Sequence, residues 1–213
     1  MVFELLLWML GAYLVAGVPV GLLIGLARGV DLRETGSGNI GATNAVRALG
    51  RRWGLLVFAL DVAKAALPML AAVHRFAAEP AGPTLIAVIG VAAIVGHVFP
   101  VYLRFAGGKG VACAFGVFLV LAPKAALFGL FVYLQTLWLT RISAVGSLTA
   151  TLVIVGATWL DPSVPFPYVV LAAGMAGLIW ERHRENLERV LAAARAAKAR
   201  EAELGREPEP EPE

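Results

Sequence analysis

Long apolar stretches separated by short polar ones make up most of the chain. A helix needs about 20 apolar residues to cross a bilayer, and several stretches reach or approach that length. The pattern predicts an all-α integral membrane protein with seven transmembrane helices. The predicted spans are Phe3–Leu26, Trp53–Val73, Thr84–Leu103, Val111–Ala122, Ala125–Thr140, Ala144–Leu160 and Pro165–Trp180.

The number of spans depends on the fourth and fifth stretches, which only Pro123 and Lys124 separate. One broken helix there would leave six spans. A single span over Val111–Leu139 would hold about 29 residues, too long for a straight crossing at about 1.5 Å per residue. Proline also ends helices readily, so we favour seven spans. The first stretch starts almost at Met1 without a basic segment before it, and we expect it to be retained rather than cleaved.

The composition agrees with a membrane location. Hydrophobic residues make up 59% of the chain and charged residues 15%, whereas a soluble domain carries about 25% charged residues. Too few polar side chains remain to cover a soluble core of this size. The single cysteine, Cys113, excludes an internal disulfide framework and a zinc site built from cysteines.

Positive charges gather in the loops on one side of the predicted bundle. With seven spans, 15 of the 18 Lys and Arg residues fall on the side of the 27–52 segment and the C-terminus. The positive-inside rule makes that side cytoplasmic, so we expect the N-terminus outside and the C-terminus inside. We divide the chain into a membrane domain, residues 1–190, and a cytoplasmic tail, residues 191–213. The tail holds most of a charged helix, Leu187–Leu204, and a disordered end, Glu207–Glu213.

The first polar constellation, Thr35–Arg47, lies in the long segment between the first two spans. Its glycines let the backbone approach a ligand closely, and its arginine offers a planar fork suited to phosphate. Gly36–Gly41 formally matches the dinucleotide fingerprint GxGxxG, but a membrane span precedes it instead of a strand. The segment is either a flexible linker or an anion site. Its candidate phosphate ligands are Ser37, Gly38, Asn39, Thr43, Asn44 and Arg47.

The second constellation, Gly96–Ala112, precedes the fourth span. Free N–H groups in a glycine-rich loop form an anion nest, and the start of a helix adds positive potential. A Walker A loop is excluded, because Lys109 is followed by glycine rather than Ser or Thr. The alternative is a tight turn whose lysine anchors at the membrane interface. The candidate phosphate ligands are Gly107, Gly108, Lys109 and Gly110.

The third constellation, Glu181–Arg189, follows the last span. His183 and Asn186 are three residues apart, so they share a helix face. Basic residues after a final span are usually topology markers or lipid anchors, a purpose that His183 and Asn186 do not serve. We therefore treat these two as candidates for the chemistry.

Two further charges, Asp61 and Lys64, lie three residues apart inside the second span, either as a simple ion pair or as support of a binding site.

All three constellations fall on the predicted cytoplasmic side, so they can meet in one pocket open to cytosol and lipid. Such a pocket has phosphate-type anion sites and no metal-ligand cluster. It suits a phosphorylated, water-soluble substrate that meets an acyl or lipid substrate. The candidate supporting residues are His97, Asp61, Lys64 and Arg182.

In chain order the constellations read GSGNIGATN-x-x-R, then GHxFP followed by GGKGVA, then R-H-x-x-N-x-x-R. These sequences resemble the three ordered motifs of the bacterial acyl-phosphate:glycerol-3-phosphate acyltransferases, PlsY-type. DVAK in the second span resembles the D-x-x-K of that family, although Ala65 stands where the family usually has glycine. The resemblance covers about residues 1–190.

The resemblance implies transfer of an acyl chain from acyl phosphate to the 1-hydroxyl of sn-glycerol 3-phosphate, giving lysophosphatidic acid and phosphate in the first step of phospholipid synthesis. It implies no cofactor, no metal and no nucleic acid. The partners are the two substrates and the lipid bilayer of the bacterial cytoplasmic (inner) membrane, with the active site facing the cytoplasm, and we expect a monomer. The residues implicated in activity are Ser37, Arg47, Lys109, His183 and Asn186.

The chemistry of these residues fits that reaction. Acyl phosphate is a mixed anhydride with a good leaving group, and the two glycine-rich loops would hold the two phosphates. His183 and Asn186 would orient the glycerol hydroxyl, and either His183 or the donor's own phosphate can accept the proton. We count Ser37 as a third catalytic candidate but disfavour it as a covalent nucleophile, because no His–acid pair is evident beside it.

Rival functions fit less well. A transporter or channel for an anion or phosphate ester would need polar groups near the bilayer midplane, where only Asp61 and Lys64 lie. Acyltransferases of the H-x4-D class have an aspartate five residues after the histidine. Here the residue five after His183 is Glu188, and proteins of that class usually have a soluble α/β domain. A structural scaffold would leave the glycine-rich motifs unexplained.

Overall fold

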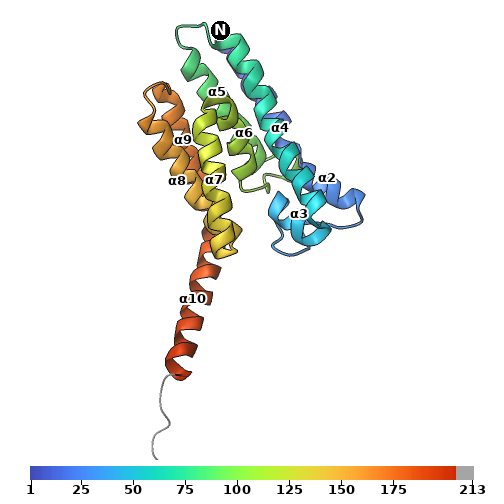
Figure 1. The fold of residues 1–213 in the computed structure, drawn as a ribbon. Helices are drawn as coiled ribbons and strands as arrows, with labels where there is room; N and C mark the ends of the chain where they lie inside the picture. Colours follow the sequence, from blue (N-terminus) through green and yellow to red (C-terminus); the bar gives the residue numbers. More distant parts are fainter. Residues whose placement is uncertain (205–213) are drawn as a thin grey trace, which may run out of the picture.

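The computed structural model describes the backbone of residues 1–204 and the side chains of residues 1–196; that part of the chain is helical, without strands. Most helices run alongside one another in a bundle, and the last one projects from it (Figure 1). A 3₁₀ turn, η1, covers Val101–Leu103. The α-helices are α1 (Val2–Gly17), α2 (Val20–Ala27), α3 (Ala42–Leu49), α4 (Arg51–Phe76), α5 (Gly82–Val98), α6 (Val111–Leu121), α7 (Pro123–Thr140), α8 (Ser143–Leu160), α9 (Phe166–Arg182) and α10 (Arg184–Leu204).

Every predicted span corresponds to one or two of these helices, and the all-helical prediction is confirmed for the described residues. Four helical stretches are long and apolar enough to cross a membrane, and α6 is a shorter apolar helix of 11 residues. The predicted tail helix is present as α10, whereas the acidic end, Glu207–Glu213, lies outside the described residues. The four long stretches are Val2–Ala27, Arg51–Phe76, Gly82–Leu103 and Ser143–Leu160.

Proline lies at the breaks in the first and third predicted spans and between the fourth and fifth, whereas Pro68 lies inside α4 without ending it. The first predicted span is interrupted at Val18–Pro19, because Pro19 has no N–H to continue the helix. The third ends as an α-helix at Val98, two residues before Pro100. The fourth and fifth are separate helices with only Ala122 between them, as predicted. The first and third spans are therefore less regular than the apolar pattern indicated.

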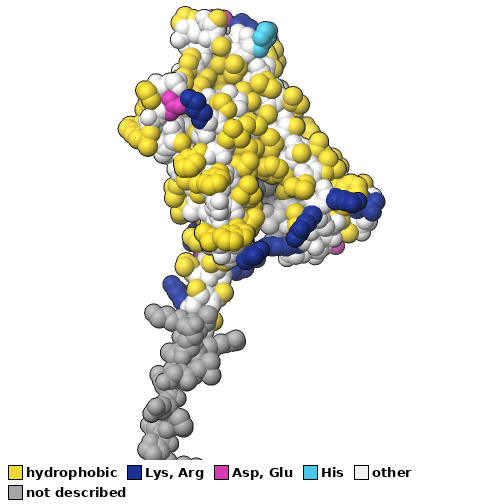
Figure 2. Space-filling view, viewed as in Figure 1, with side chains coloured by type: hydrophobic (Ala, Val, Ile, Leu, Met, Phe, Trp, Pro, Cys, Tyr) yellow, Lys and Arg dark blue, Asp and Glu magenta, His cyan; other side chains and the backbone are white. Residues whose placement is uncertain are grey.

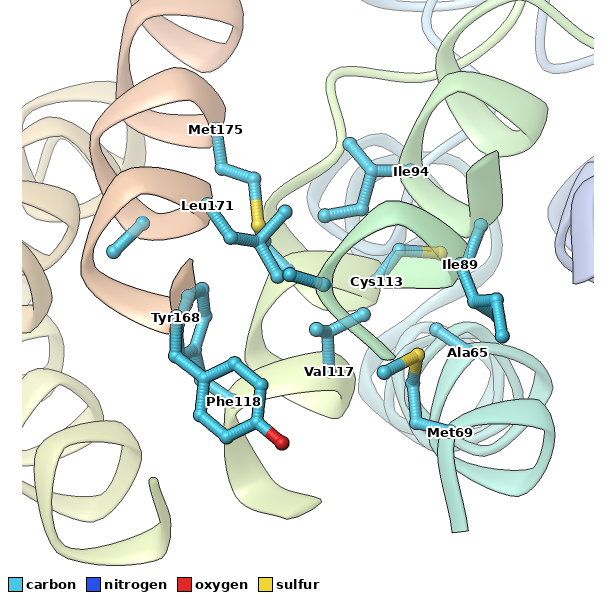
Figure 3. Close-up of a cluster of buried hydrophobic side chains, with 14 of the residues drawn as sticks. Ala65, Met69, Ile89, Ile94, Cys113, Val117, Phe118, Tyr168, Leu171 and Met175 are labelled. Carbon is cyan, nitrogen blue, oxygen red and sulfur yellow. The ribbon is translucent and has the colours of Figure 1, made fainter. Parts of the chain in front are cut away.

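The centre of the bundle is a dry core where α4, α5, α6 and α9 meet (Figure 3). Met69, Ile89 and Val117 are fully buried there. Gly116 lets α6 approach α4 closely, since a Cβ atom at this position would lie 2.4 Å from the Val62 carbonyl oxygen. The short helix α6 therefore packs against α4 in the middle of the bundle.

The length of α6 sets the depth of the segment that precedes it. α6 has 11 residues and α7 has 18, and the two are joined at Ala122. At about 1.5 Å per residue, the start of α6 lies roughly 10 Å short of the far end of α7. In Figure 1 the start of α6 is accordingly inside the bundle rather than at its end. The glycine-rich segment before α6 is therefore sunk between the longer helices.

The outer surface is apolar over most of the bundle, and Lys and Arg side chains gather near one end (Figure 2). Large exposed side chains such as Leu55, Phe131 and Trp159 belong to the apolar surface. The basic end is the one at which α3 lies and α4 begins. Its exposed arginines are Arg28, Arg33, Arg47, Arg51 and Arg52.

Candidate active site

A cavity of about 570 Å³ lies between α4 on one side and α7 and α8 on the other. All three polar constellations reach it, together with the start of α6. Five predicted residues of the described part of the chain do not line it: Gly38, Gly107, Gly108, Lys64 and Arg182. The predicted residues that line it are Ser37, Asn39, Thr43, Asn44, Arg47, Asp61, His97, Lys109, Gly110, His183 and Asn186.

Asn44 organises the loop that carries Ser37. It lies in the first turn of α3, a helix that the sequence pattern did not predict, and its side chain is buried. The amide donates to the carbonyls of Leu32 and Thr35, both at 2.9 Å, and its oxygen accepts the N–H of Ser37 at 3.0 Å. This differs from the expectation that Asn44 binds phosphate, because both of its N–H donors are already used.

A chain of hydroxyl groups ties the same loop to the opposite wall of the cavity. The Thr43 side chain is hydrogen-bonded to Ser143 at 3.0 Å, and Ser143 to Tyr133 at 3.0 Å. These contacts join α3 to α8 and α7. One turn further along α3, Arg47 also lines the cavity. The first constellation is thus an ordered loop and helix rather than a flexible linker.

The glycine loop before α6 is held by backbone hydrogen bonds. The N–H of Gly107 donates to the Val98 carbonyl at 3.2 Å, and that of Gly108 to the His97 carbonyl at 3.1 Å. In the predicted anion nest, Gly107–Gly110, the first two N–H groups are therefore already paired and cannot donate to an anion. Lys109, Gly110 and the first turn of α6 remain to face an anion.

Lys109 joins the second constellation to the third. Its ammonium donates a hydrogen bond to the side-chain oxygen of Asn186, in the first turn of α10. Partial burial, together with a smaller effect of the nearby Arg189 guanidinium, lowers the pKa of Lys109 to about 8. Near neutral pH the ammonium form predominates and is available to an anion in the cavity.

His183 is held in one orientation at the junction of α9 and α10. Its side chain is buried, and its Nδ1 lies 2.8 Å from the Ile179 carbonyl oxygen. A carbonyl only accepts, so Nδ1 carries the proton and Nε2 is left as an acceptor in the neutral ring. Burial lowers the pKa of His183 to about 4, which keeps the ring neutral at physiological pH.

Asp61 and Lys64 form an ion pair of 2.8 Å inside α4, as one of the two sequence-based alternatives anticipated. One ligand atom each of Asp61, His97 and Cys113 lies within 4.8 Å of the others, a spacing that a metal ion could bridge. A metal there would compete with the Lys64 ammonium for the same carboxylate, and the Cys113 thiol is already hydrogen-bonded to the Asp61 carbonyl. We assign no metal to this cluster.

Beyond the polar groups the cavity continues as an apolar groove. Ser143, at the polar end, and Ile154 both line it from α8 and are eleven residues apart, roughly 16 Å along a helix. The groove runs along α4, α7 and α8 and is long enough for part of an acyl chain. Its apolar lining residues include Leu55, Phe58, Phe115, Leu130, Leu134, Leu137, Ala150 and Ile154.

The family model for glycerol-3-phosphate acyltransferase matches residues 6–193. The glycerol-3-phosphate acyltransferase of Anaeromyxobacter sp. (strain K) is 48% identical over 182 residues, which are 84% of this chain and 90% of that protein. The protein of the same name from Aquifex aeolicus (strain VF5) is 40% identical over 183 residues, 84% of this chain and 92% of that one. The chain belongs to the glycerol-3-phosphate acyltransferase family.

Solved structures of this family agree with the fold. PlsY (YgiH), an integral membrane glycerol 3-phosphate acyltransferase, has been crystallised in a glycerol 3-phosphate form that superposes with a TM-score of 0.83 at 38% identity. The match covers 89% of this chain and 93% of that one. Its lysophosphatidic acid form gives a TM-score of 0.82. With its apolar helices and this likeness, the chain is an all-α integral membrane protein, and the family resemblance seen in the sequence is confirmed.

Sequence reasoning left some cavity residues of this acyltransferase unassigned. Arg189 lines the cavity, and its place in the R-H-x-x-N-x-x-R motif, three residues after Asn186, was an available signal. Ser143, Tyr133 and Thr151 also line it but stand outside every motif. They arrive there because α7 and α8 pack together, which no short sequence pattern shows.

Proposed function

We propose that this protein transfers the acyl chain of an acyl phosphate to the 1-hydroxyl of sn-glycerol 3-phosphate, producing lysophosphatidic acid and phosphate. One observation carries the proposal: a single cavity joins cationic, glycine-rich segments to an apolar groove. A water-soluble phosphate ester and a lipid-borne acyl chain can meet there. The names of its relatives, and the glycerol 3-phosphate and lysophosphatidic acid forms of PlsY, support the same assignment.

Two groups of residues are proposed to bind the two phosphates. One is Ser37 and Asn39 with Thr43 and Arg47, where the guanidinium can make paired hydrogen bonds. The other is Lys109 with the N–H of Gly110 and the start of α6. Arg189 adds positive charge beside Lys109. The N–H donors of Gly38, Gly107, Gly108 and the Asn44 amide are paired within the protein, so these residues shape the loops rather than bind phosphate.

The reaction requires little activation of the donor. The glycerol 1-hydroxyl oxygen attacks the carbonyl carbon, the bond from that carbon to the bridging phosphate oxygen breaks, and phosphate departs. We assign the hydroxyl proton to the departing phosphate, because a His183 ring with a pKa of about 4 is a weak base. Neutral His183 then orients the hydroxyl through Nε2, and Asn186 holds Lys109 against the phosphate.

The acyl chain is proposed to lie in the groove between α4 and the α7–α8 pair. Its walls are apolar side chains, and the outer surface of the bundle around it is apolar as well (Figure 2). A donor dissolved in the bilayer can therefore slide its tail in from the side while its phosphate reaches Arg47 and Lys109.

The membrane arrangement is part of the proposal. The chain crosses a bacterial cytoplasmic membrane seven times as a monomer, with the N-terminus outside, the C-terminus inside and the cavity facing the cytoplasm. The exposed arginines at the end where α4 begins support this orientation. Residues 1–190 form the membrane domain and 191–213 the cytoplasmic tail. In a Cys113→Ser background, an impermeant thiol reagent outside the cell should label Ala81→Cys and spare Arg52→Cys; the reverse would overturn the orientation.

The donor assay tests the proposed activity. Purified protein with palmitoyl phosphate and glycerol 3-phosphate should form lysophosphatidic acid, and palmitoyl-coenzyme A should not replace the acyl phosphate. Acylation from the coenzyme A ester with none from acyl phosphate would overturn the proposal. Transport is tested separately with vesicles preloaded with glycerol 3-phosphate, which should retain it unless acyl phosphate is added.

A further inference from the structure

A buried ion pair in the middle of α4 touches two other parts of the fold. The side chains of Lys64 and Asp61 are 2.8 Å apart and only 7% and 4% exposed. The Lys64 ammonium also donates a hydrogen bond of 2.6 Å to the Val18 carbonyl, at the break between α1 and α2. The lysine therefore has two partners, and the carboxylate is held in one orientation.

The carboxylate of Asp61 faces His97 on α5. Asp61 Oδ1 lies 3.7 Å from His97 Nδ1, just beyond hydrogen-bond distance. Although it is buried, Nδ1 has no hydrogen-bond partner among the described residues. Asp61 is the acidic group beside it, so the rotation of the imidazole is sensitive to where the carboxylate points.

His97 in turn supports the glycine loop. Its carbonyl accepts the N–H of Gly108 at 3.1 Å. Its ring packs against the same residue so closely that a Cβ atom on Gly108 would lie 2.2 Å from Nε2. A larger residue at Gly108 would have to displace the His97 ring, and Lys109 follows directly. A displacement of His97 is therefore passed to the ammonium that lines the cavity.

Stability alone does not account for an ionised pair inside a membrane span. Ionisable residues in the bilayer are costly, and apolar residues of similar volume often replace a buried pair without loss of stability. The Asp61 carboxylate also lines the cavity, where without a counter-charge it would repel phosphates. Lys64 supplies that counter-charge.

We propose that Asp61 and Lys64 are positioning residues for phosphate binding. The ion pair fixes the carboxylate, the carboxylate fixes His97, and His97 fixes the Gly107–Gly110 loop that presents Lys109. The proposal rests on the proposed function, in which Lys109 binds a substrate phosphate. It differs from a role in which the pair only pins the break between α1 and α2.

The test uses full-length protein with Lys64→Met alone and with Lys64→Met combined with Asp61→Asn. The single change leaves an uncompensated buried carboxylate and should lower Tm. The double change removes both charges at nearly constant volume. It should restore a Tm near that of wild type, keep kcat within about threefold and raise the KM of at least one phosphate substrate about tenfold or more. Arg75→Gln, which breaks the ion pairs of an α4 residue with Glu4 and Glu79 away from the cavity, should leave both KM values unchanged.

The route through His97 is tested by a further combination. Adding the double change to His97→Gln should raise KM no further than His97→Gln alone, because effects along one chain of contacts are not additive. A folded double variant with wild-type KM for both substrates would overturn the proposal, and so would effects that simply multiply. Binding of glycerol 3-phosphate to each variant is also measured by calorimetry, which does not depend on turnover. A wild-type protein without turnover would count against the proposed function and not against the positioning role.

Discussion

Lys109 and Asn186 are 77 positions apart in the chain, yet the Lys109 ammonium donates a hydrogen bond to the side-chain oxygen of Asn186. The contact joins the glycine loop before α6 to the first turn of α10. Both residues line the cavity, so the second and third sequence motifs act on the same space. Their pairing leaves the ammonium positioned before any substrate arrives.

Asn186→Ala should therefore impair substrate binding without unfolding the protein. A hydrogen bond to a charged group contributes about 1.5–3 kcal/mol, so kcat/KM should fall roughly 10- to 150-fold. Steady-state kinetics on purified protein measure the change. Gln135→Ala, at an exposed amide on α7, is the matched control and should behave as wild type. Wild-type kcat/KM in Asn186→Ala would show that the contact has no part in binding.

The charge of Lys109 predicts a pH dependence. Because burial lowers its pKa to about 8, the ammonium is present below that pH and is lost as the pH rises through it. The KM of a phosphate substrate should therefore increase above about pH 8. Bound phosphate stabilises the ammonium, so in the complex the charge is lost at a somewhat higher pH. Lys109→Arg should remove this increase, since arginine stays charged. An identical rise in both proteins would assign it to another group.

His183→Ala distinguishes an orienting role from a general base. Loss of one ordinary hydrogen bond of about 1 kcal/mol should lower kcat by about tenfold or less. A general base contributes roughly 100- to 10,000-fold. We expect the smaller loss. In the wild-type protein, kcat should not change with the titration of His183 above about pH 5, because the pKa of His183 is lowered to about 4. A loss beyond a hundredfold, at unchanged Tm, would make His183 the proton acceptor.

The apolar groove predicts a change in chain-length preference. Ala150 lines the groove on α8, seven residues beyond Ser143 at its polar end. Ala150→Leu should fill part of the groove, clash with a long chain at a cost of about 1–3 kcal/mol, and lower kcat/KM for long relative to short acyl phosphates by about tenfold or more. Leu152→Phe, two residues on and 54% exposed to the outside, should leave the preference unchanged. An unaltered preference in Ala150→Leu would place the acyl chain elsewhere.

Much of the fold could be predicted because a bilayer leaves few options. Apolar runs must form helices there, since every backbone polar group has to be paired within its own segment. The apolar runs did not show the break at Pro19, because a proline inside such a run gives no indication of whether the helix bends or ends. They also could not show α3, which has only eight residues, with polar side chains among the apolar ones, and which packs through the buried Asn44 and Ala45.

The site was only partly predictable, because sequence motifs show which residue types are present but not which of them contact one another. Lys109, His183 and Arg47 stand in dense polar motifs whose chemistry suits phosphate, and topology brings them together. Asn44 and Gly108 stand in the same motifs, but their contacts show that they shape the loops. Residue type alone does not separate a ligand from its support. That distinction needs the hydrogen-bond partners, which only the folded chain provides.

The most direct test of the account measures both products in one time course. Purified protein is incubated with palmitoyl phosphate, with and without glycerol 3-phosphate, and lysophosphatidic acid and phosphate are quantified together. We predict equal molar amounts of the two products with glycerol 3-phosphate and neither above background without it. Phosphate release that does not require glycerol 3-phosphate, or that occurs without lysophosphatidic acid, would contradict the account.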